Sequence, residues 1–96
     1  MLGKKILILG GTGFVGSYVT KKLLRRADVT VFFGREHGVD LIETSSFRSA
    51  VNKIKPDVIL NLAAISDLDK YPLTKIYDTN AFSIVRILEY LHEINF

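Results

Sequence analysis

The stretch from Lys5 to Gly16, KILILGGTGFVG, constrains the fold more than any other part of the chain. Four consecutive branched aliphatic residues, at positions 6 to 9, are typical of a strand buried on both faces within a parallel sheet. Three glycines at a spacing of three residues follow, and a helical pattern begins at once. The pattern therefore indicates a buried strand, a tight glycine turn and a helix, which together form the first half of a βαβ unit.

Each of the three glycines has a separate physical role in such a unit. Gly10 permits the tight turn off the strand, Gly13 lets the backbone approach a pyrophosphate, and Gly16 lets the helix pack close to the sheet. The free amides and the positive dipole end of the helix then face the phosphates. The alternative, a glycine-rich turn without a ligand, is disfavoured by the buried strand before it and the helix after it. The residues that we expect to contact a dinucleotide here are Gly10, Thr12, Gly13, Phe14, Val15 and Gly16.

Length and composition bound the class of protein. The 96 residues predict a single domain, 1–96, with 48% hydrophobic and 24% charged residues, as in an ordinary globular protein. No apolar run approaches the roughly 20 residues that span a bilayer, and the absence of cysteine excludes disulfides and thiolate metal sites. His37 and His92 have no second ligand at usable spacing, so no metal site is expected. We expect a cytoplasmic protein without a membrane partner.

The net charge of +3 is concentrated near the end of the first predicted helix, at Lys21, Lys22, Arg25 and Arg26. Cations at a helix C-terminus are favoured by the helix dipole. No aromatic residue is interleaved with them to stack on bases. A nucleic-acid partner is therefore not expected.

Apolar runs alternate with helical patterns along the whole chain. We expect helices over about 13–26, from Ser45 or Ser46 to Pro56, and from about Leu73 or Lys75 onward. Strands are expected at 6–9, 29–33, 38–42 (brief) and 57–64. With right-handed crossovers, the strands lie in the order 3-2-1-4. The predicted fold is a truncated α/β Rossmann fold: a parallel sheet of about four strands with helices on both faces, lacking the later strands and a substrate domain. The inward stripes are expected at Phe14, Val15, Tyr18, Val19 and Leu23; at Phe47, Ala50, Val51 and Ile54; and at Asn80, Ala81, Ile84, Val85, Leu88 and Leu91.

The end of the second predicted strand bears on which dinucleotide is bound. An NAD site usually offers an acidic side chain there to hold the ribose hydroxyls. Here Arg35 follows the strand by one residue, and its guanidinium suits the 2′-phosphate of NADP. The residues thus favour NADP(H) over NAD(H). The alternative stays open that the neighbouring Glu36 holds the ribose hydroxyls instead. At the end of the last strand, the small Ala63 and Ala64 either let a flat ligand lie against the backbone or merely sit under a helix.

The chain resembles the N-terminal third of an extended short-chain dehydrogenase/reductase, a family of nucleotide-sugar epimerases, dehydratases and reductases. The resemblance is carried by the glycine pattern, by Asp40-Leu41 where the family contacts adenine, by Asn61-Leu62-Ala63-Ala64 after a strand, and by Asn80 in the following helix. It implies that Asp40, Leu41, Leu62, Ala63, Ala64 and Asn80 also contact the cofactor. The stretch from Pro56 to Ala64, followed by Ser66 and Leu68-Asp69-Lys70, is most similar to the dTDP-4-dehydrorhamnose reductase subfamily. There, Ser66 is expected on the substrate side.

The family's catalytic pair, a tyrosine followed four residues later by a lysine, belongs beyond the fifth strand, where this chain has no counterpart. Tyr71 and Lys75 match those letters, but Pro72 between them disfavours the helical turn that would bring the side chains together. No catalytic residue is therefore assigned.

Two functions remain open from the sequence. The first is the NADP(H)-binding part of a dTDP-4-dehydrorhamnose reductase-like oxidoreductase, inactive alone. The second is a non-catalytic nucleotide-binding or regulatory subunit of the same family. In either case the last strand is an edge without protecting charges. We expect it to pair with a second copy or with a missing C-terminal half.

Overall fold

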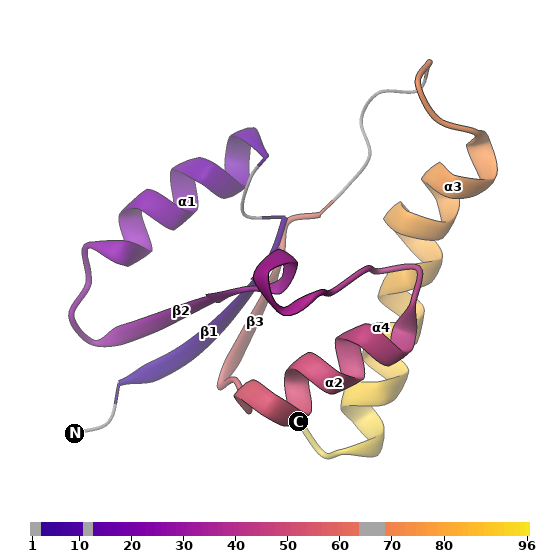
Figure 1. Cartoon of the computed structure of the whole chain (residues 1–96). Helices are drawn as coiled ribbons and strands as arrows, with labels where there is room; N and C mark the ends of the chain where they lie inside the picture. The colour runs from indigo at the N-terminus through magenta and orange to yellow at the C-terminus, as the bar shows by residue number, and fades with distance from the viewer. Residues whose placement is uncertain (1–2, 11–12, 64–68) are drawn as a thin grey trace.

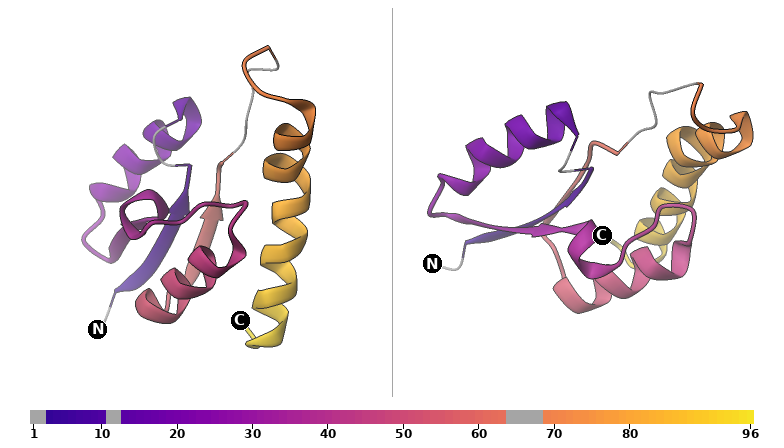
Figure 2. Two further views of the ribbon diagram at one scale, coloured as in Figure 1. Left: turned by 45° about the vertical axis from the view of Figure 1, so that its right-hand side comes forward. Right: turned by 45° about the horizontal axis from the view of Figure 1, so that its top comes forward.

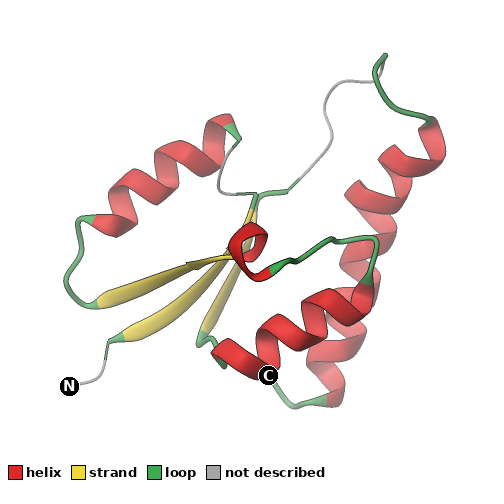
Figure 3. Cartoon of the chain, viewed as in Figure 1, coloured by secondary structure: helices red, strands yellow, loops and turns green. Residues whose placement is uncertain are grey.

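The computed structural model describes residues 3–10, 13–63 and 69–96. Three parallel strands form one sheet in the order β2-β1-β3, with α1 on one face and α2 and α4 on the other (Figures 1 and 2). Figure 3 shows how the helices and strands alternate along the chain. The elements are β1 (Lys4–Leu9), α1 (Phe14–Leu24), β2 (Val29–Phe33), the 3₁₀ helix η1 (Gly34–His37), α2 (Thr44–Ile54), β3 (Val58–Asn61), α3 (Leu73–Tyr77), the π-helical η2 (Asp78–Phe82) and α4 (Ser83–Glu93).

Strand β1 lies at the centre of the sheet, as its unbroken aliphatic run predicts. Ile6 is paired with Val31 of β2 on one side and with Val58 of β3 on the other. The four residues of the run are 8% exposed or less. Beyond β3, Leu62 N donates to Leu9 O at 2.7 Å. The predicted order of these three strands is confirmed.

The hydrophobic core lies between the sheet and helices α2 and α4. Phe47 packs edge-on against Tyr90, with 6.1 Å between the ring centroids, and Tyr90 donates its hydroxyl to Asn52 Oδ1 at 3.1 Å. The predicted inward stripe of α2 is confirmed, since all four of its members are buried. The core residues are Leu7 and Leu9 from β1, Phe47, Ala50, Val51 and Ile54 from α2, and Ile87 and Tyr90 from α4.

The segment predicted as a brief third strand, residues 38–42, forms turns and irregular backbone instead. Gly38 adopts the left-handed conformation that ends η1. Ile42 N then donates to Asp40 Oδ1 at 3.0 Å, and Ser46 Oγ accepts from Asp40 N at 2.9 Å. These local side-chain bonds to the backbone compete with a strand ladder. The described part of the chain accordingly contains three strands where four were expected.

The predicted inward faces of the first and last helices were also wrong in part. On α1, Gly16 and Thr20 are buried, whereas Phe14 is 95% and Tyr18 is 64% exposed. On α4, the buried residues are Ser83, Ile87 and Tyr90, and the expected Ile84, Val85 and Leu88 are exposed. A π-helical turn, η2, separates α3 from α4 and changes the phase of the helix. None of the described helices is long and apolar enough to cross a membrane.

Candidate functional site

The turn between β1 and α1 is held tightly against the end of β3. Gly10 has φ +82°, and a Cβ added there would lie 2.5 Å from Ala63 N and 2.6 Å from Ala63 Cα. Asn61 contributes to this close approach, because its Oδ1 accepts from Ala63 N at 3.2 Å just beyond β3. Only glycine combines this conformation with this proximity. The ends of β1 and β3 therefore meet, backbone to backbone, at the carboxyl edge of the sheet.

Helix α1 begins with its N-terminus open to a ligand. Gly13 is the N-cap, its carbonyl accepts from Ser17 N at 2.7 Å, and the first turn of α1 contains no acidic residue. Among the described residues, a Cβ added at Gly13 would meet only Gly10 O, at 3.7 Å. Because the side of the turn at Gly13 is free of such contacts, a diphosphate can approach the backbone there. The positive end of the helix dipole favours an anion in this position.

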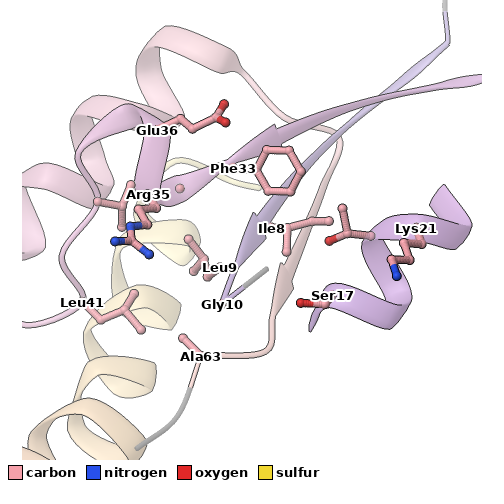
Figure 4. A pocket seen from close by; sticks show the side chains of 13 residues that line it. Ile8, Leu9, Gly10, Ser17, Lys21, Phe33, Arg35, Glu36, Leu41 and Ala63 are labelled. Carbon is pink, nitrogen blue, oxygen red and sulfur yellow. The ribbon is translucent and has the colours of Figure 1, made fainter. Parts of the chain in front are cut away.

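A cleft of about 680 Å³ opens beside this turn (Figure 4). Its size falls within the roughly 300–1,000 Å³ typical of small-molecule sites. One wall comes from α1, the opposite wall comes from the end of β2 and from η1, and the carboxyl end of β1 lies between them. The lining residues are Ile8, Leu9, Gly10, Ser17, Thr20, Lys21, Phe33, Gly34, Arg35, Glu36, Val39, Leu41 and Ala63.

The predicted cofactor-binding residues divide into three groups. Gly10, Arg35, Leu41 and Ala63 line the cleft. A second group does not belong to that lining: Gly13, Phe14, Val15, Gly16, Asp40, Leu62 and Asn80. Of these, Phe14 and Val15 are exposed on α1, and Asn80 lies in η2. The carboxylate of Asp40 is bonded to Ile42 N. Thr12, Ala64 and Ser66 lie outside the described residues.

The cleft also contains polar residues that the sequence analysis did not select. Ser17, Thr20 and Lys21 lie on α1 at i, i+3 and i+4, the spacing that places helical residues on one face. Thr20 is 9% exposed, and its Oγ1 is buried without a hydrogen-bond partner among the described residues. The signal in the sequence was this polar spacing. The aromatic and aliphatic residues beside it form a stronger apolar stripe, which predicts the opposite orientation of the helix.

The residues present fit a dinucleotide on three observations. Among the described residues, the Gly13 side of the turn is open and the buried Thr20 hydroxyl lacks a partner. The cleft is predominantly apolar in its middle, with charged groups at its rim (Figure 4). An apolar pocket with a few polar groups is what a nucleoside requires. Among the described lining residues, Lys21 and Arg35 carry a positive charge, and Glu36 is the single acid.

Tyr71 and Lys75 do approach each other, contrary to the expectation from Pro72. Pro72 is the N-cap of α3, and Lys75 Nζ lies over the Tyr71 ring, 4.9 Å from its centroid. Lys70 Nζ approaches the same ring at 5.7 Å. The contact is thus a cation–π interaction with the ring face. Neither residue lines the cleft.

A central parallel strand, a glycine turn into a helix and a cleft at the carboxyl edge of the sheet define a Rossmann-like α/β domain. Residues 6–96 match the model of the NAD dependent epimerase/dehydratase family. The chain belongs to that family, which lies within the extended short-chain dehydrogenase/reductases that the motifs of the chain resemble.

Two curated relatives are, by name, a dehydrogenase and a reductase. The chain is 30% identical over 92 residues to GDP-6-deoxy-D-talose 4-dehydrogenase from Aggregatibacter actinomycetemcomitans, covering 95% of this chain and 31% of that protein. It is 34% identical over 64 residues to dTDP-4-dehydrorhamnose reductase from Streptomyces griseus, covering 67% of this chain and 21% of that protein. The chain thus spans a third or less of the length of these relatives.

Solved structures share the fold over nearly the whole chain. A hypothetical dTDP-4-dehydrorhamnose reductase from Sulfolobus tokodaii superposes with a TM-score of 0.74 at 28% identity, over 95% of this chain and 36% of the other. The dTDP-4-dehydrorhamnose reductase from Bacillus anthracis, solved in complex with NADP, gives a TM-score of 0.72 at 21% identity, over 91% and 31%. At that identity the second likeness supports the fold alone.

Proposed function

We propose that this chain binds a nicotinamide dinucleotide, NADP(H) in preference to NAD(H), and serves as the cofactor-binding part of an oxidoreductase that reduces a nucleotide-linked 4-keto sugar. The observation that carries the proposal is the turn from β1 to α1: no described side chain contacts the backbone at Gly13, and Gly10 packs tightly against the end of β3. The proposed class of reaction follows relatives that the chain resembles, among them dTDP-4-dehydrorhamnose reductase.

The proposed roles of the residues follow from their positions. The amides at the start of α1 hold the diphosphate, with Gly16 keeping the helix close to the sheet. Leu41 and Ala63 line the apolar middle of the cleft and contact the adenosine half, and Arg35 at its rim faces the ribose phosphate. A bound nicotinamide supplies hydride transfer. For Asp40, Leu62 and Asn80, the proposed contacts rest on the family resemblance alone.

The chain is proposed to be inactive by itself. Reduction of a ketone requires a proton donor beside the carbonyl. The Tyr71–Lys75 pair meets through the ring face and lies outside the cleft lining, so we assign it no catalytic role. The second candidate function is a non-catalytic nucleotide-binding or regulatory module. The geometry of the turn from β1 to α1 supports this function equally. It would be distinguished from the reductase by the absence of any partner chain that restores turnover.

We also propose that β3 is an association surface. It pairs with β1 on one side only within the described sheet, and Val58 is 41% exposed. Unpaired N–H and C=O groups along such an edge accept a further strand. The proposed partner is a second copy of this chain or a chain that supplies the later strands of the sheet.

Titration with NADPH and NADH, followed by the fluorescence of the reduced nicotinamide, tests the proposal. We expect saturable binding of NADPH, weaker binding of NADH, and no oxidation of NADPH when a dTDP-4-keto sugar is added. Gly13→Ala places a methyl group where the diphosphate approaches and should weaken binding of both dinucleotides at least tenfold. Absence of NADPH binding at millimolar concentration, with the chain folded, would contradict the proposal.

A further inference from the structure

Helix α1 turns a polar side toward the cleft although apolar side chains were available. Ser17, Thr20 and Lys21 line the cleft, while Val15 and Tyr18 of the same helix are 59% and 64% exposed. Burial normally selects the apolar side of a helix. The orientation of α1 therefore indicates that this wall of the cleft meets something polar.

Thr20 gives the second observation. Its side chain is buried and its hydroxyl has no hydrogen-bond partner among the described residues. A buried hydroxyl left unpaired costs free energy, so such groups in native proteins are normally bonded to protein, water or ligand. A ligand oxygen in the cleft would satisfy this one.

The charges around the cleft specify the kind of ligand group. Lys21 on α1 and Arg35 on η1 line opposite walls, and Figure 4 shows both labelled side chains at the rim of the same space. Glu36 is the only acid among the described residues that line the cleft. Two cations against one acid favour a phosphate dianion over neutral ribose hydroxyls. Lys22, one residue further along, instead stacks over Tyr18, 5.5 Å from the ring centroid.

We propose that Lys21 and Thr20 of α1 form, opposite Arg35, the second wall of the site that recognises the 2′-phosphate of NADP(H). Lys21 supplies a charge-assisted hydrogen bond to the phosphate, and the Thr20 hydroxyl donates to a phosphate or ribose oxygen. Two elements thus select NADP(H). The first is the end of β2, where the sequence predicts phosphate recognition by Arg35. The second is the second turn of α1, for which no sequence motif predicts it. This inference rests on the proposed function.

Paired lysine variants test the role of Lys21. Dissociation constants for NADPH and NADH are measured by calorimetry for Lys21→Ala and for its matched control Lys22→Ala, which removes the same charge from the same helix. We expect Lys21→Ala to weaken NADPH binding about tenfold, with NADH changed less than about twofold and Lys22→Ala changing neither. Lys21→Arg should retain most of the NADPH affinity.

Equal effects of the two alanine variants on NADPH would overturn the inference, because the helix would then act only through its general charge. An unchanged NADPH affinity in Lys21→Ala would overturn it as well and leave the proposed function standing. Failure of the unsubstituted chain to bind either dinucleotide would instead remove the proposed function.

Thr20→Val separates a ligand contact from a structural role. Valine keeps the shape of threonine and removes a hydroxyl that has no partner among the described residues, so the free energy of unfolding without ligand should be equal or higher. NADPH binding should nevertheless weaken several-fold. Unchanged NADPH affinity in Thr20→Val would show that the hydroxyl meets no ligand.

Discussion

Replacing Gly10 by alanine should destabilise the fold through two separate contributions. The left-handed backbone conformation, φ +82°, costs a residue with a Cβ roughly 1–2 kcal/mol. The new Cβ would also lie 2.5 Å from Ala63 N and 2.6 Å from Leu62 C. These are backbone atoms at the end of β3 and cannot rotate away as a side chain would. Forcing extra volume into a packed site costs typically about 1–3 kcal/mol.

The expected loss in Gly10→Ala is therefore about 3 kcal/mol, a large part of the roughly 5–15 kcal/mol that stabilises a domain. Equilibrium urea unfolding, followed by far-UV circular dichroism, measures it as a lower midpoint at unchanged slope. Thermal unfolding should show a midpoint lowered by more than about 10 °C, since 1 kcal/mol corresponds to roughly 4–8 °C in a domain of this size.

Two other glycines provide matched controls. Gly38 has φ +72° but nothing within 4 Å of an added Cβ, so Gly38→Ala carries the conformational cost alone, about 1 kcal/mol. Gly13 has an extended backbone with φ −72°, and Gly13→Ala should leave stability nearly unchanged while weakening dinucleotide binding. If Gly10→Ala loses no more stability than Gly38→Ala, the close approach of β1 and β3 is refuted.

Three further predictions concern the core, the surface charges and the sheet edge. Phe47→Ala should lose about 3–5 kcal/mol of stability, because the ring is buried in the core, whereas Phe14→Ala, at an exposed ring, should lose almost none in a denaturant titration. Arg26 lowers the pKa of Asp28 through a hydrogen bond and its charge. This exposed pair gives a small stabilisation at pH values above the ordinary pKa of Asp28. The stabilisation is lost as the pH falls through the lowered pKa of Asp28 in the folded chain. An NMR titration of Asp28 should give a midpoint below 3.8 that rises in Arg26→Ala. Val58→Lys places a charge on the exposed β3 edge and should shift sedimentation at high concentration toward monomer; an unshifted profile would exclude the edge as the contact.

Much of the fold could be predicted because one pattern, the aliphatic run into spaced glycines, has few structural solutions. A run that is apolar at every position suits only the centre of a parallel sheet, and β1 lies there. The residues of β2 were predicted to the residue, and the inward face of α2 was correct, because its apolar positions fall on a single stripe. In both segments the local preference and the tertiary environment agree.

The failures occurred where more than one face or conformation was open to the chain. Helix α4 is apolar on adjacent faces, so periodicity alone could not select Ile87 over Leu88, and the π-helical turn before it altered the phase. At Asp40, a side-chain bond to the backbone replaced an expected strand. On α1, Gly16 and Thr20 face inward because small side chains let the helix lie close to the sheet, which exposes Tyr18.

For the candidate site, Gly10, Arg35, Leu41 and Ala63 were selected from their positions at or after strand ends, and all four line the cleft. Their contact with a cofactor stays a prediction. Thr20 and Lys21 could not be selected in this way. They enter the cleft through the rotation of α1, which depends on packing against the sheet, and their polar spacing alone does not determine that rotation.

The most direct test of diphosphate binding at the start of α1 is a two-dimensional amide NMR titration with NADPH. We predict that the largest shifts fall on the amides of Gly10, Gly13, Phe14 and Val15, with smaller ones at Arg35 and Ala63. Binding that leaves those turn amides unmoved and shifts residues elsewhere would contradict the central claim.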